Sequence, residues 1–315
     1  MGNYSGVSEF HLVGFPGASE KLYLLISLTM FLIYTVVLFS NGTVILLIIL
    51  KEHLHQPMYI FIANLAFSDL LFDTITLPKI IAKYWFGAET ISFSSCLFQM
   101  FCVHFLGSFD SFIIMLMAVD RYIAICIPLR YPLIITHKAT AILCWTFWIL
   151  AASASLFNNI LFIPLPFCGP NKIKSCFCSV SSLFPLACQD VTSVRQKILV
   201  NAMIVLLAPL GFILLSYVFI LWSVKTSVHS ENWQKAFYTC TTHLIIIGMY
   251  FVPRVFVYFA NYVRLILNAD INVLLLCLYS YLPHLANPVI YCLRTEEIKR
   301  TLAKAFKIKI KVNVK

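Results

Sequence analysis

The sequence predicts an all-α membrane protein built as a bundle of seven transmembrane helices. Three observations support this fold class. The 315 residues are 61% hydrophobic and only 11% charged, whereas soluble domains have about 25% charged residues. Seven runs are each long enough to cross a bilayer core, which takes about 20 apolar residues in a helix. The lysines and arginines lie mostly outside these runs, with a bias toward one side of the membrane.

The seven expected spans follow one another along the chain and fill most of it. They cover residues 22–50, 57–81, 93–125, 139–163, 197–224, 236–263 and 271–293. Because lipid offers no hydrogen-bond partners, each run must satisfy its own backbone and is therefore predicted to be helical. Residues 1–315 are expected to form one domain, since no soluble domain and no internal repeat fits between the spans.

The placement of basic residues predicts the orientation of the chain. Of the 23 lysines and arginines, 14 fall on the side that holds residues 294–315 and eight on the other. The positive-inside rule therefore predicts a multi-pass plasma-membrane protein with residues 1–21 outside and 294–315 as a cytoplasmic tail. An acceptor sequence for N-glycosylation begins at Asn3 and would face the lumen.

The net charge of +10 does not indicate a nucleic-acid partner, because the basic residues concentrate on the expected inner face, notably in 299–315. Leu293, Ile298, Leu302 and Phe306 recur among them at roughly helical spacing. This spacing predicts a short amphipathic helix after the seventh span, lying on the membrane lipids of the inner leaflet. A disordered basic tail is the alternative interpretation.

Five of the 11 cysteines are expected outside the cell: Cys96, Cys168, Cys176, Cys178 and Cys188. Cysteines in this oxidising compartment tend to pair. Cys96 begins the third span and the other four crowd the loop after the fourth, so one bond from Cys96 would pin that loop over the bundle. The odd number leaves one thiol over. A zinc site is disfavoured because no histidine accompanies the loop cysteines and their spacing is irregular.

Polar groups at one depth of the membrane form a predicted belt. Asn41, Asp69, Asp110 and Asn287 fall at similar heights on four spans, judged from a helical rise of 1.5 Å per residue. Ionisable residues at this depth are costly and indicate function. Asp69 and Asp110 cannot both stay ionised without a counter-charge, so we expect either a bound sodium ion or a proton between them. The alternative is that the belt only joins the helices by hydrogen bonds. No other cofactor is predicted.

Asp120 and Arg121 lie at the inner end of the third span. An acid beside an arginine at the membrane boundary can latch in one state and release in another, although adjacent residues do not face one another well on a helix. An arginine that only extends toward water is the simpler interpretation.

Several motifs together resemble those of odorant (olfactory) receptors, a family of rhodopsin-like, class A G-protein-coupled receptors. The motifs are Asn41-Gly42, Pro57-Met58-Tyr59, Ala66-Phe67-Ser68-Asp69, residues 117–126, Ser216-Tyr217, residues 235–243 and residues 283–291. The match covers all seven spans, and Phe15-Pro16-Gly17 resembles the fish-like class I subgroup. The chain departs from the family pattern at Ala66, Tyr238, Thr242 and Cys176. The resemblance implies the disulfides Cys96–Cys178 and Cys168–Cys188, which makes Cys176 the unpaired thiol.

The resemblance also implies roles for individual residues. Those of the G-protein switch would be Asp120, Arg121, Tyr122, Tyr217 and Tyr291. The inner end of the sixth span, residues 235–243, would swing outward on activation, and Pro288 would kink the seventh span. Asp69 and Asp110 match the ion-site positions of the family.

A ligand is expected between helices in the outer half of the bundle. His104 and Arg254 fall at about the same depth, and a cationic arginine with a titratable histidine can receive an anion. His104 and Arg254 are therefore candidate ligand-binding residues, and positions that match the family add Phe105, Ser108, Asn201, Phe251, Tyr258, Cys277 and Ser280. His104 can instead be a structural histidine, and Arg254 can extend to water or pair with Asp73.

The resulting prediction is an odorant receptor. It binds a small, anionic or polar, water-soluble ligand and activates a stimulatory olfactory G protein, which raises cyclic AMP. The alternative is a non-olfactory rhodopsin-like receptor for a small metabolite or a lipid mediator. An enzyme is disfavoured because no catalytic constellation has a recognisable spacing, and a retinal-binding pump because residues 271–293 contain no lysine.

Overall fold

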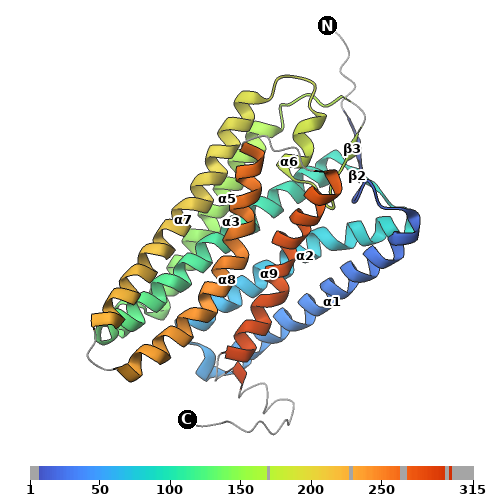
Figure 1. The fold of residues 1–315 in the computed structure, drawn as a ribbon. Helices are drawn as coiled ribbons and strands as arrows, with labels where there is room; N and C mark the ends of the chain where they lie inside the picture. The colour runs from blue at the N-terminus through green and yellow to red at the C-terminus, as the bar shows by residue number, and fades with distance from the viewer. Residues whose placement is uncertain (1–6, 169–170, 227–229, 263–267, 295–297, 300–315) are drawn as a thin grey trace.

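The computed structural model describes residues 7–168, 171–226, 230–262, 268–294 and 298–299. Within these ranges, seven helices are long and apolar enough to cross a membrane. They are α1 (Glu20–Leu50), α2 (Pro57–Phe86), α3 (Phe93–Cys126), α5 (His137–Phe162), α7 (Thr192–Thr226), α8 (Ser230–Tyr262) and α9 (Ala269–Arg294). The predicted seven-helix bundle is therefore confirmed (Figure 1).

Several helices run past the apolar segments that predicted them. α2 continues to Phe86, while α7 and α8 begin at Thr192 and Ser230, several residues before the expected spans. Hydropathy marks only the part of a helix that lies in hydrocarbon, whereas a helix can continue into water with polar residues. α2 ends at Gly87, whose φ of 68° is left-handed and whose N–H bonds the carbonyl of Lys83. Glycine takes this conformation without a Cβ penalty, so the position stops the helix.

Short elements connect the long helices. The helical ones are 3₁₀ turns at Glu52–Leu54, Pro128–Arg130 and Phe184–Leu186, together with α4 (Tyr131–Ile134) and α6 (Val180–Leu183). The strands are β1 (Glu9–Leu12), β2 (Thr90–Ser92) and β3 (Lys172–Ile173). β2, β3 and α6 lie at one end of the bundle, which we call the sheet end, and α9 finishes at the opposite end (Figure 1).

α3 is the central helix of the bundle, because it contacts α2, α5, α7 and α8. Its inward side chains, among them Phe109, Ile113 and Met117, are buried in the largest apolar cluster. α1 lies at the edge and exposes Leu24, Phe39 and other large apolar residues. Such a surface is what a lipid-facing helix needs, since lipid tails are as apolar as leucine.

The sheet end carries a small three-stranded sheet that the sequence analysis does not anticipate. β1 is the middle strand, antiparallel to β2 and parallel to β3. Within β1, the side chains of Phe10 and Leu12 are fully buried, whereas the side chain of Glu9 is exposed. The alternation of apolar and polar residues over 9–12 is a strand signal, but four residues among stronger helical signals are too few to stand out.

Two disulfides fix the long loop between α5 and α7. Cys96 at the start of α3 bonds Cys178, and Cys168 bonds Cys188 within the loop. These are the pairs that the family resemblance implies. Gln99 adds a polar anchor, because its amide donates to the Ile75 carbonyl and accepts from the Cys178 N–H at 2.9 and 2.8 Å. The loop is therefore held against α2 and α3 at a defined height.

Two predictions fall largely outside the described residues. The glycosylation acceptor Asn3 lies in residues 1–6, which the structure does not describe. The predicted amphipathic helix after the seventh span is described only at residues 298–299. There Ile298 is buried in the same cluster as the core of α3.

We expect Cys178→Ser to lose most of its cell-surface level, because the loop is released from α3. Removing a native disulfide typically costs about 2–5 kcal/mol in small secreted domains. Cell-surface biotinylation, expressed as a fraction of total receptor, measures the loss. Cys102→Ser is the matched control, because Cys102 is a buried cysteine of α3 that forms no disulfide. A normal surface level for Cys178→Ser would contradict the role of the bond.

Candidate ligand-binding site

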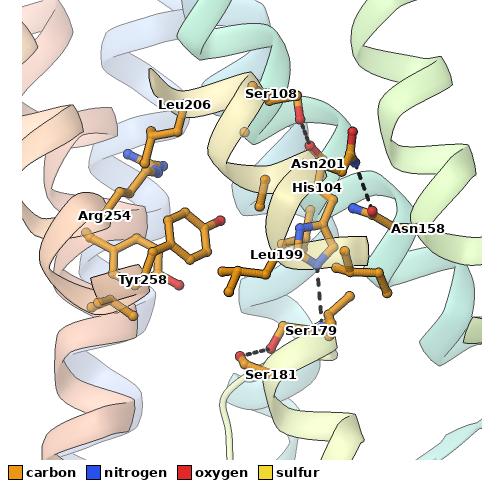
Figure 2. Close-up of a pocket in the computed structure, with 18 of the residues that line it drawn as sticks. His104, Ser108, Asn158, Ser179, Ser181, Leu199, Asn201, Leu206, Arg254 and Tyr258 are labelled. Carbon is orange, nitrogen blue, oxygen red and sulfur yellow. Dashed lines mark hydrogen bonds between the residues drawn. The ribbon is translucent and has the colours of Figure 1, made fainter. Parts of the chain in front are cut away.

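A cavity of about 350 Å³ lies between α3, α5, α7, α8 and α9, close to the sheet end. Loop residues Phe177, Ser179 and Val180 close it on that side. Six of the nine predicted ligand-binding residues line it: His104, Ser108, Asn201, Arg254, Tyr258 and Ser280. In Figure 2, Arg254 and Tyr258 extend from α8 on one side, while His104 and Asn201 lie across the cavity from them. A cavity of this size suits a small ligand.

Arg254 is the buried cation of the cavity, since its side chain is only 8% exposed. One Nη atom donates to the Tyr250 carbonyl at 3.1 Å, and the guanidinium lies 3.7 Å from the centroid of the Tyr250 ring. The Tyr279 ring lies 5.4 Å away. Among the residues that the structure describes, Arg254 forms no ion pair. Since a guanidinium has five N–H donors, it retains capacity for an anion.

Asp73 is not the partner of Arg254, which corrects one of the alternatives raised by the sequence. Its Oδ1 lies 2.7 Å from Nδ1 of His284 on α9. Spacing along the chain cannot reveal this pairing, because it depends on how α2 and α9 are rotated toward one another. Arg254 therefore lines the cavity without an ion pair to any acid that the structure describes.

His104 is an acceptor in this site rather than a second cation. Its Nε2 faces the Val180 backbone N–H at 3.4 Å, and this amide can donate only to an unprotonated ring nitrogen. In this geometry Nε2 of His104 accepts the hydrogen bond. His104 lines the cavity together with Arg254, and its part in receiving an anion stays a prediction. His104 also ties α3 to the loop at the sheet end of the cavity (Figure 2).

Polar groups opposite Arg254 are oriented by their own hydrogen bonds. Asn201 on α7 donates to the Ala154 carbonyl and to Oδ1 of Asn158 at 3.0 and 2.9 Å, both on α5. The Ser108 hydroxyl donates to the His104 carbonyl at 2.7 Å. Their donors are thus used within the protein, and what the oxygens of Asn201 and Ser108 offer a ligand is mainly acceptor capacity.

Three predicted ligand-binding residues lie outside the cavity, which corrects those assignments. Phe105 packs against Phe101 and Trp148, with ring centroids 5.6 and 5.2 Å apart. Phe251 is buried in the main core beside Tyr250. The Cys277 Sγ lies 3.5 Å from the Cys176 Sγ. Each residue along a helix is rotated by about 100° from the one before it. A residue next to one that lines the cavity, such as Phe105 after His104, therefore points away from the cavity.

The sequence analysis missed other lining residues, including Asn158, Arg195, Tyr250 and Tyr279. Asn158 carried a signal, since it is a polar residue within an expected span. Tyr250 lies one helical turn before Arg254, which also places it on the same face. Arg195 lies at the start of α7 above the Phe184 ring, where neither periodicity nor the spans point to the cavity.

The predicted polar belt forms one buried cluster deeper in the bundle, with His284 at its centre. Nδ1 of His284 contacts Asp73, and Nε2 lies 3.4 Å from Oδ1 of Asp69, within ion-pair range. Asn287 donates to Oδ2 of Asp69, and Asn41 donates to the His284 carbonyl, both at 3.1 Å. Ligand atoms of Asp69, Asp110 and His284 all lie within 4.8 Å of one another. The sequence analysis named the belt but not His284.

This cluster can hold a cation. Oδ1 of Asp69, Oδ1 of Asp110 and Oδ1 of Asn287 are buried without a hydrogen-bond partner among the described residues. Oxygen ligands of this kind suit a hard metal ion. A protonated His284 supplies a positive charge at the same place, because carboxylates face both of its ring nitrogens. The residues therefore fit either form of counter-charge.

The predicted switch residues lie toward the opposite end of the bundle. Asp120 accepts a hydrogen bond from the Tyr131 hydroxyl of α4 at 2.8 Å rather than pairing with Arg121. Burial and the Asp120 carboxylate raise the pKa of the Tyr131 phenol, so it remains a donor at neutral pH. Tyr217 bonds Nδ1 of His243 at 2.7 Å and so joins α7 to α8. Tyr291 faces the Met117 sulfur at 3.9 Å, and Tyr122 packs beside Phe219.

The fold is that of a rhodopsin-like receptor. The structure of squid rhodopsin superposes with a TM-score of 0.72 and 16% sequence identity, covering 92% of this chain and 87% of that chain. The family model for olfactory receptors matches residues 30–309. Human olfactory receptor 10G7 is 36% identical over 305 residues, covering 96% of both chains. Rat olfactory receptor 226 is 35% identical over 305 residues, covering 95% of this chain and 92% of the relative.

The chain belongs to the olfactory receptor family. It is therefore a multi-pass plasma-membrane receptor for odorants that couples to a G protein, and it is not an enzyme. Family membership favours this reading over the alternative of a non-olfactory receptor for a metabolite or a lipid mediator.

We expect His284→Gln to destabilise the receptor by about 3–5 kcal/mol, because it leaves buried carboxylates without a counter-charge. Thermal unfolding of the detergent-solubilised receptor, followed by tryptophan fluorescence, measures the effect. Asp73→Asn combined with His284→Gln should cost less than the two single changes together, by about 0.5–3 kcal/mol. Strict additivity of the two changes would show that they do not act as a pair.

Proposed function

We propose that the receptor recognises a small, water-soluble odorant bearing a carboxylate or another compact anion, with Arg254 as its partner. The observation that carries the proposal is the guanidinium of Arg254, which lines the cavity without a described acid beside it. A charged group at membrane depth is costly unless something receives it. Carboxylate and sulfate match the flat guanidinium with two parallel hydrogen bonds.

The rest of the cavity suits a short apolar body with a second polar group. Leu199, Leu206 and Val205 supply apolar walls, and Tyr258 adds a ring with a hydroxyl. Asn201 and Ser108 lie across from Arg254 (Figure 2). Their oxygens favour a hydroxyl or amine donor at the far end of the ligand. The volume of about 350 Å³ limits the ligand to a small molecule.

The sheet end is proposed to face the outside of the cell. It carries both disulfides, and such bonds persist in oxidising compartments. The cavity lies close to this end, where loop residues and Arg195 line it. The excess of lysine and arginine on the other side supports a cytoplasmic position for residues 294–315. Anionic lipids of the inner leaflet are the proposed partners of that tail.

The opposite end is proposed to engage a stimulatory olfactory G protein, which raises cyclic AMP. Asp120, Arg121 and Tyr122 carry the motif that supports this assignment. The Tyr131–Asp120 and Tyr217–His243 bonds join neighbouring elements there. These contacts are the ones that must rearrange if the ends of the helices separate on activation.

The buried cluster is proposed to keep its counter-charge in the resting receptor, as a sodium ion at Asp69 and Asp110 or as a protonated His284. Unpartnered oxygens of Asp69, Asp110 and Asn287 support the ion. The carboxylates on both sides of the imidazole support the proton. In both cases the charge joins α2, α3 and α9.

We expect Arg254→Ala to raise the half-maximal concentration of an active acid about 10- to 150-fold, since a charge-assisted hydrogen bond contributes about 1.5–3 kcal/mol. Arg254→Lys should weaken the response less. A cyclic AMP assay with a panel of short carboxylic acids and their methyl esters provides the measurement. Arg195→Ala is the control, because Arg195 lines the cavity but is exposed. Methyl esters that act on the wild type as well as their acids would overturn the proposal.

Arg121→Ala should abolish ligand-stimulated cyclic AMP while leaving the cell-surface level intact, because the change removes the proposed G-protein contact without touching the cavity. The cyclic AMP response normalised to surface receptor measures it. Arg130→Ala is the matched control, since Arg130 lies exposed at the same end. Normal signalling by Arg121→Ala at normal surface level would refute the switch assignment.

A further inference from the structure

Two thiols meet where the long loop contacts α9. Cys176 is fully buried in the loop, and Cys277 is half-buried on α9. Their Sγ atoms lie 3.5 Å apart, although the residues are separated by 101 positions in the sequence. Neither of them belongs to a disulfide. Neither the ligand cavity nor the switch uses this pair.

Both thiols are held in place by their surroundings. Two residues after Cys176, Cys178 is bonded to Cys96, and the Ser175 carbonyl accepts from the Gly14 N–H at 3.1 Å. On the α9 side, the Tyr281 hydroxyl lies 3.1 Å from the Thr76 hydroxyl and donates to it. The Phe177 ring packs on the Tyr281 ring with centroids 6.3 Å apart. The loop and α9 therefore meet with little freedom to move the sulfur atoms apart.

We propose that Cys176 and Cys277 form a third disulfide, which fastens the loop to α9. The S–S bond length is about 2.05 Å, so the two sulfur atoms have to approach by about 1.5 Å, a distance within reach of side-chain rotation. The oxidant is a disulfide of the secretory or extracellular space, such as oxidised glutathione or the active-site disulfide of an oxidoreductase.

The exchange proceeds in two steps. Cys277 is the more accessible thiol, so its thiolate attacks the disulfide of the oxidant, forms a mixed disulfide and releases one thiol. The Cys176 thiolate then attacks the Cys277 sulfur and displaces the second thiol. The two cysteines lose two protons and two electrons, and the oxidant becomes two thiols, so the step is balanced.

The surroundings of Cys176 set the conditions for this exchange. The hydrogen bond from Cys277 and burial raise the pKa of the Cys176 thiol, while the Lys83 ammonium opposes them. Little Cys176 is therefore ionised at neutral pH. Because the thiolate is the nucleophile, a small oxidant should act faster at mildly alkaline pH.

The bond would connect two walls of the ligand cavity. On the loop, the lining residues Phe177 and Ser179 lie within three positions after Cys176. On α9, the lining residues Tyr279 and Ser280 lie within three positions after Cys277. Joining the two cysteines fixes the distance between the lid of the cavity and α9. Formation of this bond does not depend on which ligand occupies the cavity.

Peptide mapping of the full-length receptor tests the proposal without a ligand. The receptor in isolated membranes is treated with oxidised glutathione at pH 8, blocked with N-ethylmaleimide in denaturant and digested with trypsin and chymotrypsin. Trypsin cleaves after Lys174 and chymotrypsin after Phe177, which separates Cys176 from both Cys168 and Cys178. Mass spectrometry should find Cys176 and Cys277 in one linked peptide that dithiothreitol separates. Cys144, a buried cysteine of α5 outside any disulfide, should remain alkylated throughout.

Two variants sharpen the result. Cys277→Ser should leave Cys176 in the alkylated pool, and Cys144→Ser should leave the linked peptide unchanged. Oxidation should raise the Tm of the wild type by several degrees and leave that of Cys277→Ser unchanged. The proposal is overturned if Cys176 is recovered alkylated after oxidation of the wild type, or linked to Cys96 or Cys168. An equal shift in Tm for wild type and Cys277→Ser would also overturn it.

Discussion

The contact of His284 with Asp73 and Asp69 is the interaction on which the arrangement of the bundle depends. It brings α2 and α9 together at a depth where water cannot neutralise charge, and Asp110 adds α3 to the same cluster. Asn41 brings α1 to the His284 carbonyl. Apolar packing alone allows helices in lipid to rotate and slide, because lipid and side chains are alike. A charged residue that meets its partner at only one rotation of its helix removes that freedom.

The cost of a charge at membrane depth also applies to Arg254, which lies closer to the sheet end. Arg254 is as costly in lipid as the carboxylates are, yet its described surroundings are aromatic rings and a carbonyl rather than an acid. A cation that the fold leaves unneutralised beside a cavity favours an anionic ligand. One physical rule thus applies to both places: a charge with a partner within the bundle fixes helices, and under the proposed function Arg254, which has no ion pair among the described residues, selects the ligand.

The features that could be predicted from the sequence are those that depend on composition and motifs along the chain. Hydropathy located seven spans, and the motif resemblance implied both disulfides and four residues that line the cavity; depth along the helices added His104 and Arg254. The contacts that could not be predicted are those that depend on how neighbouring helices are rotated toward one another. Phe105 is next to the lining residue His104 yet points to Trp148, and Asp73 meets His284 instead of Arg254. The strand at Phe10 and Leu12 was missed because its partners are far apart in sequence.

The geometry also indicates where a bound ligand can act on the rest of the bundle. The loop that covers the cavity is fixed by β1, Gln99 and the disulfide to α3, so it offers little movement. α8 is different, because Pro253 cannot donate to the carbonyl four residues earlier and weakens the helix beside Arg254. Eleven residues away, about 16 Å along the same helix, His243 bonds Tyr217. Arg254 and the contact between α7 and α8 therefore lie on one helix, on either side of Pro253.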